Sequence, residues 1–165
     1  MIESKQNHSF YRDSISEKGF LSIIETGYAI KPVGVGMNFL KINIINGYKF
    51  NPYFYLGFGT GWYHYFNAKF SVIPLFADCR INLSNRNFSP YLALAAGYYF
   101  SYSGNKTNGL LVCPAIGFRF KTNTYEAIHF GLSYEMQKLN SYQIVYSHYD
   151  TDFIHFIGIN LGYSF

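Results

Sequence analysis

The sequence has few charged residues and no long apolar run. Asp, Glu, Lys and Arg make up 13% of its 165 residues, whereas a soluble domain carries about 25%, so a fully hydrated surface would be hard to build. No stretch approaches the roughly 18 consecutive apolar residues of a transmembrane helix. Aromatic residues are abundant instead, at 21%, with 17 Tyr and 17 Phe. This combination fits a transmembrane β-barrel, whose signal per strand is weak.

Motifs of common enzymes and metal sites are also absent. The sequence contains no G-x-S-x-G, no HExxH and no closely spaced cysteine pair, so we expect no metal and no cofactor. Cys79 and Cys113 are predicted on opposite faces of non-neighbouring strands, which favours two free, buried thiols over a disulfide. The net charge of +4 is small and its basic residues are scattered, which argues against a nucleic-acid partner.

Large apolar residues alternate with small or polar residues along the last fourteen positions, 152–165. Period-two alternation is typical of a strand whose two faces meet different media. Seven further segments carry comparable patterns, about 19–30, 37–50, 53–66, 70–83, 91–102, 110–121 and 126–139. Eight strands of this length suit a tilted passage through a membrane. We therefore predict a single all-β domain, an eight-stranded antiparallel up-and-down transmembrane β-barrel over 18–165, after a polar tail at 1–17.

The connections of such a barrel alternate in kind. Turn residues at 51–52, 84–90 and 122–124 predict short turns after the second, fourth and sixth strands. The other connections would be loops at the opposite end, of which 140–151 is the longest. Pro74 and Pro114 fall inside predicted strands, where proline cannot donate to the ladder, so we expect bulges and a change of face there.

The charged residues decide which face points outward. Six of them share the small and polar face of their strands, where a basic residue turned to lipid would cost about 2–4 kcal/mol near the midplane. They are Glu25, Lys41, Asp78, Arg80, Arg119 and Glu135. We predict a paired network of these residues that plugs the lumen, with Arg80 and Arg119 as hubs. The alternative is that Lys41 and Glu25 lie near the outer mouth and meet water.

The opposite face carries Leu, Ile and Phe at mid-strand and aromatic residues near strand ends, as expected for lipid contact. A soluble barrel would reverse the faces and leave an outer coat of Gly, Ala and Ser, which holds too little charge for solubility. Inward Gly and Ala would make room for bulky side chains rather than for solvent. The tyrosines predicted to fill the interior are Tyr53, Tyr55, Tyr63, Tyr65 and Tyr99.

Three segments, Gly47–Gly61, Ser89–Tyr98 and the terminal Gly162-Tyr-Ser-Phe165, resemble the small eight-stranded outer-membrane barrels of Gram-negative bacteria. These are the OmpA-like, OmpX-like and porin-like barrels, and the resemblance covers about residues 18–165. It implies an integral outer-membrane protein of the cell envelope, with outer-membrane lipid and lipopolysaccharide as partners; we expect a monomer. Such proteins are exported, so we expect a signal peptide that is absent from this chain.

The resemblance is specific for architecture and carries no catalytic residue over. The interpretation that the residues favour is a non-enzymatic barrel without an open pore, in a structural or surface-interaction role. One alternative is adhesion or binding of a glycan or protein through loop 140–151, where aromatic residues offer flat amphipathic surface. Its candidates are Tyr142, Tyr146, His148 and Tyr149. A less favoured alternative is a lipid A-modifying enzyme, with His64 or His155 as the base near the outer rim and Ser71 among the nucleophiles. Interfacial His and Ser are more often ordinary girdle residues.

Overall fold

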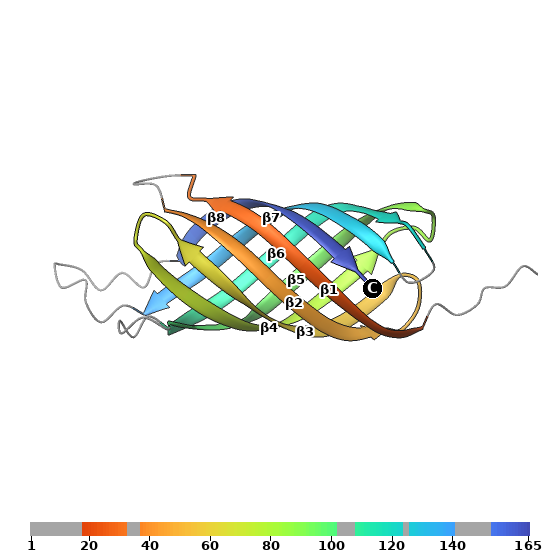
Figure 1. The fold of residues 1–165 in the computed structure, drawn as a ribbon, viewed down its shortest axis with the longest axis horizontal. Helices are drawn as coiled ribbons and strands as arrows, with labels where there is room; N and C mark the ends of the chain where they lie inside the picture. Colours follow the sequence, from red (N-terminus) through yellow and green to blue (C-terminus); the bar gives the residue numbers. More distant parts are fainter. Residues whose placement is uncertain (1–17, 33–36, 102–107, 124–125, 141–152) are drawn as a thin grey trace, which may run out of the picture.

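Eight strands close into one barrel in the computed structural model, which describes residues 18–32, 37–101, 108–123, 126–140 and 153–165 (Figure 1). The strands are β1 Gly19–Ile30, β2 Asn38–Lys49, β3 Phe54–Tyr65, β4 Phe70–Asn82, β5 Phe88–Ser101, β6 Asn108–Lys121, β7 Ala127–Asn140 and β8 Phe153–Ser164. Each strand is antiparallel to its neighbours, and β8 pairs with β1. The predicted eight-stranded antiparallel barrel is confirmed. Among the described residues, no helix is long and apolar enough to cross a membrane.

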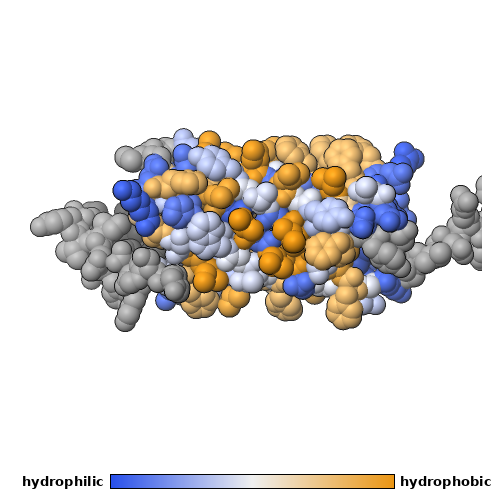
Figure 2. Space-filling view, in the orientation of Figure 1, coloured by the Kyte–Doolittle hydropathy of each residue, from blue (hydrophilic) through white to orange (hydrophobic). Residues whose placement is uncertain are grey.

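The alternation in the sequence corresponds to side chains that point out of the barrel and side chains that point into its lumen. On β8, Ile159 and Leu161 are each 52% exposed, whereas Asn160 between them is 5% exposed. The same pattern runs through the other strands, so the outer surface over the strands is largely apolar. Figure 2 shows these apolar side chains along the barrel wall, with most of the strongly hydrophilic side chains near its two ends. This distribution matches a hydrocarbon layer around the middle of the barrel.

The two ends of the barrel differ in their connections. We call one the turn end, where β2–β3, β4–β5 and β6–β7 are joined, and the other the loop end. At the β2–β3 turn, the side-chain oxygen of Asn51 accepts hydrogen bonds from the backbone N–H groups of Tyr53 and Phe54, both at 2.8 Å. This Asx turn explains why the chain reverses at Asn51. The start of β1 and the end of β8 also lie at the turn end, where Ser22 and Phe165 exchange two backbone hydrogen bonds.

The bulges and the face change predicted at the prolines do not occur. The ladders beside Pro74 and Pro114 lose two residue pairs each and then resume in the same register. The inward and outward alternation continues through both prolines. Pro74 still pairs with Tyr99 on its other side, and Thr60 Oγ1 donates to its carbonyl oxygen at 2.9 Å. Neighbours on both sides therefore hold the register, and each proline costs only local hydrogen bonds.

Three local expectations also need correction. Strand β5 begins at Phe88, three residues before the predicted start, because Ser84 and Ser89 are hydrogen-bonded across a shorter turn. Tyr53 lies in the β2–β3 turn and is 50% exposed, so it does not fill the lumen. Cys79 is partly exposed on the outer face, whereas Cys113 is buried, so only one of the two free thiols is buried as predicted.

Candidate functional site

The middle of the lumen is filled by a central cluster of five hydrogen-bonded side chains, each at most 3% exposed. They are Lys41 on β2, Tyr65 on β3, and Ser133, Glu135 and Gln137 on β7. Lys41 Nζ contacts Glu135 Oε2 at 3.2 Å and Ser133 Oγ at 3.4 Å. Gln137 donates to the second carboxylate oxygen, Oε1, at 2.5 Å and accepts from the Tyr65 hydroxyl at 2.5 Å. Both carboxylate oxygens are therefore paired, as a buried charge requires.

A glycine on β1 lets Lys41 reach across the lumen. A Cβ placed on Gly27 would lie 2.8 Å from Cε of Lys41, which is closer than two carbon atoms approach. Gly131 has the same relation to an inward tyrosine, because a Cβ there would lie 2.6 Å from the hydroxyl of Tyr91. The inward glycines thus provide the space that the long side chains occupy, as the sequence predicts.

Aromatic rings close the lumen between the central cluster and the loop end. Phe39 is fully buried, and its ring centroid lies 4.9 Å from Tyr65, 5.4 Å from Tyr63 and 5.0 Å from Phe156. Rings at these distances and angles attract one another beyond the area they bury. This aromatic layer leaves the central cluster out of reach of water from the loop end.

A second ion cluster lies toward the turn end. Arg80 donates through Nε to Asp78 at 2.8 Å and through Nη2 to Glu25 at 3.0 Å, and its guanidinium lies 5.9 Å from the ring centroid of Tyr91. Glu25 is 7% exposed, so it does not meet bulk water at a mouth. The planar guanidinium can hold two carboxylates in fixed directions, which an ammonium cannot.

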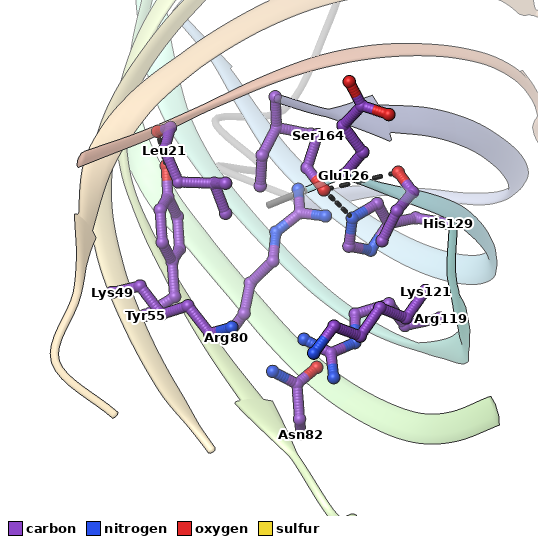
Figure 3. Close-up of a pocket in the computed structure, with 12 residues that line it drawn as sticks. Leu21, Lys49, Tyr55, Arg80, Asn82, Arg119, Lys121, Glu126, His129 and Ser164 are labelled. Carbon is purple, nitrogen blue, oxygen red and sulfur yellow. Dashed lines mark hydrogen bonds between the residues drawn. The ribbon is translucent and has the colours of Figure 1, made fainter. Parts of the chain in front are cut away.

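Five of the six predicted network residues therefore lie in two ion clusters with separate acids rather than in one. Arg119 is buried and lines a pocket at the turn end together with Arg80, His129 and Ser164 (Figure 3). For the polar network itself, the sequence analysis names only charged residues. It missed Gln137, His129 and other polar members, although their positions on the inward face of β7 were the available signal.

The two histidines proposed as bases lie on the outer face near the loop end, each beside a hydroxyl group. His64 Nδ1 is 3.0 Å from Ser71 Oγ on the neighbouring strand β4, and its ring stacks on Trp62 at 5.3 Å. His155 Nδ1 is 2.9 Å from the phenol of Tyr134 instead. Of these two histidines, His64 is the one paired with an aliphatic alcohol that a base could activate.

The loop candidates Tyr142, Tyr146, His148 and Tyr149 lie outside the described residues, so binding through 140–151 stays a prediction. Within the described part of the chain, no group of three or more His, Cys, Asp or Glu side chains is arranged to hold a metal ion.

No protein-family model and no curated protein matches the sequence. Solved structures match the fold. Neisserial surface protein A has a TM-score of 0.62 at 14% identity, over 90% of this chain and 96% of that one. Ail of Yersinia pestis, solved with the heparin analogue sucrose octasulfate, has a TM-score of 0.52 at 18% identity, over 90% and 98%. The outer membrane enzyme PagL gives 0.52 at 8% identity, over 88% and 98%. The chain has the fold of the small eight-stranded outer-membrane barrels.

The central cluster predicts a large stability effect of one substitution. Replacing Lys41 by Met leaves the Glu135 carboxylate buried without its cation, which should lower the free energy of unfolding by about 3–5 kcal/mol. Urea unfolding in detergent measures this change. The double variant Lys41→Met, Glu135→Leu is the matched control, because it removes both charges and should regain most of the loss. A loss below about 1 kcal/mol for Lys41→Met would mean that water reaches the carboxylate.

Proposed function

We propose that this protein is an integral outer-membrane barrel with a structural role in the cell envelope, closed to solutes and without catalysis in its lumen. The observation that carries the proposal is the filled lumen, in which the Lys41–Glu135 pair and the aromatic layer around Phe39 occupy the cross-section. The apolar outer wall supports placement in a lipid bilayer. The fold of small outer-membrane barrels supports the outer membrane in particular, with lipid and lipopolysaccharide as its surroundings.

A filled lumen has a direct electrical consequence. Side chains just fill an eight-stranded barrel, and an ion would have to break buried, paired charges to pass. Purified protein in planar bilayers should therefore give no stable conductance. A reproducible channel in the nanosiemens range would contradict the closed barrel, and a wide porin recorded in the same bilayers provides the positive control.

Surface interaction is the alternative within the same architecture. Ail was solved with a sulfated heparin analogue, and this chain has Lys31 and Lys69 beside its loop-end connections. A sulfated glycan is therefore the first ligand class to test. The tyrosines of 140–151 would contact the sugar rings while the lysines meet the sulfates. Replacing 141–151 by a short turn should therefore weaken heparin binding by cells that display the protein, whereas replacing the turn at 84–87 should not. Equal heparin binding by both variants would mean that residues 141–151 do not bind the glycan.

A second candidate function, an ester hydrolase acting on membrane lipid, is favoured by the contact between His64 and Ser71. The pair lies on the lipid-facing surface near the loop end, where an acyl ester of an outer-leaflet lipid could approach. His64 would take the proton of Ser71 as its oxygen attacks the ester carbonyl, and would then protonate the departing alcohol. Water would release the fatty acid from the serine in the same way. PagL, an outer membrane enzyme, has the same fold.

Lipid A mass spectrometry separates this candidate from the structural role. Expression of the intact chain should remove an acyl group from lipid A, and both Ser71→Ala and His64→Ala should abolish the change. His155→Ala is the matched control and should retain activity, because His155 contacts the phenol of Tyr134 rather than a serine. Unchanged lipid A after expression of the intact chain would contradict the hydrolase and leave the structural and surface-interaction roles.

A further inference from the structure

A pocket at the turn end of the barrel carries an excess of positive charge. Four basic side chains line it, Lys49, Arg80, Arg119 and Lys121, and Glu126 is the carboxylate among the lining residues. The charge of Arg80 is already met by Asp78 and Glu25, so the excess comes from the other three. They come from β2, β4 and β6, and only the closed barrel brings them together. Figure 3 shows the long basic side chains extending into the same hollow, with His129 and Ser164 beside it. Such a concentration of cations at a narrow mouth attracts anions.

One hydrogen-bond donor of this pocket is buried and unused. Arg80 is 4% exposed, and its Nε and Nη2 atoms bind Asp78 and Glu25. Its Nη1 atom has no hydrogen-bond partner among the described residues. A buried N–H of a charged group without an acceptor is costly, so an acceptor at this position would be strongly favoured.

An unused acceptor lies in the same pocket. The Ser164 hydroxyl lies 3.3 Å from the carbonyl oxygen of Ala127, which can only accept, and 3.1 Å from His129 Nε2. We assign its single hydrogen to the carbonyl, so that the imidazole donates through Nε2. In a neutral ring, Nδ1 of His129 then carries a lone pair, and it has no partner within the described part of the chain. A ligand that accepts a hydrogen bond from Arg80 Nη1 and donates one to His129 Nδ1 would satisfy both atoms.

We propose that the turn-end pocket binds a protonated phosphate-type oxyanion, either free hydrogen phosphate or a phosphomonoester head group. Its P–O⁻ oxygen accepts from Arg80 Nη1, and its P–OH donates to His129 Nδ1. Sulfate cannot make the second bond at neutral pH because it carries no proton. The cationic side chains at the mouth, Lys49 and Lys121, neutralise the remaining charge.

The size of the pocket restricts how the anion enters. Its volume of about 30 Å³ has room for about two water molecules, so one or two oxygen atoms enter while the rest of the ligand stays at the mouth. A nucleotide or a sugar chain cannot enter, whereas a terminal phosphate can. This proposal does not depend on the structural role, because the central cluster and the aromatic layer lie deeper in the barrel.

Calorimetric titration of the full chain in maltoside micelles tests the site. Inorganic phosphate should bind saturably, sulfate at equal ionic strength at least about tenfold more weakly, and chloride not at all. Lys121→Gln should weaken phosphate binding about tenfold through loss of one charge-assisted contact. Lys49→Gln gives a second variant at the same mouth. Heat-modifiable mobility on gels checks that each variant folds.

The matched control is Lys31→Gln, which removes the same charge at the loop end and should leave phosphate binding unchanged. Three results would overturn the proposal. They are no saturable binding of phosphate, equal binding of sulfate, and a loss in Lys31→Gln as large as that in Lys121→Gln. The first would mean that water alone fills the pocket.

Lipid added to the same micelles identifies the source of the phosphate. Phosphatidic acid, a phosphomonoester, should compete with inorganic phosphate if a head group is the natural ligand. Binding of phosphate without competition by phosphatidic acid would assign the pocket to the free anion. Phosphatidylglycerol, whose diester has no P–OH, should not compete, and competition equal to that of phosphatidic acid would contradict the bond to His129.

Discussion

The pairing of β8 with β1 is the contact on which the rest of the structure depends. A bilayer offers no water to unpaired backbone groups, so a sheet can span it only when closed and without an edge. Eight backbone pairs between Ile23–Ile30 of β1 and Ile157–Ser164 of β8 provide this closure. Pro74 and Pro114, in the middle of β4 and β6, are tolerated for the same reason, because a strand held on both sides keeps its register when a few ladder bonds are lost.

Closure also determines the chemistry of the interior. A narrow barrel forces side chains from opposite strands into contact, so Lys41 on β2 meets Glu135 on β7, and Arg80 on β4 meets Glu25 on β1. Charges in such a place must be paired or hydrogen-bonded. The central cluster meets this condition fully. The turn-end pocket meets it only in part, and a site with unused buried donors and acceptors is where a ligand gains most.

The outer face of the barrel is largely apolar, unlike the interior. Its large apolar residues are suited to lipid, so polar contacts there occur in pairs, as between His64 and Ser71 and between His155 and Tyr134. Pairing lowers the cost of placing a polar group at the membrane surface. The same pairing brings a base to a serine in one case and to a phenol in the other, which gives the two histidines different chemical capacities.

The sequence by itself determined the eight strands, the direction of the faces away from Pro74 and Pro114, and the inward position of the six charged residues, because period-two alternation and the cost of charge in lipid are local properties. It could not determine which charges meet. Partners such as Lys41 and Glu135 are 94 residues apart, and the stagger between strands decides which inward positions share a level of the lumen. The tertiary structure therefore decided that Arg80 bridges two acids, that Arg119 belongs to the turn-end pocket, and that Ser71 is the partner of His64.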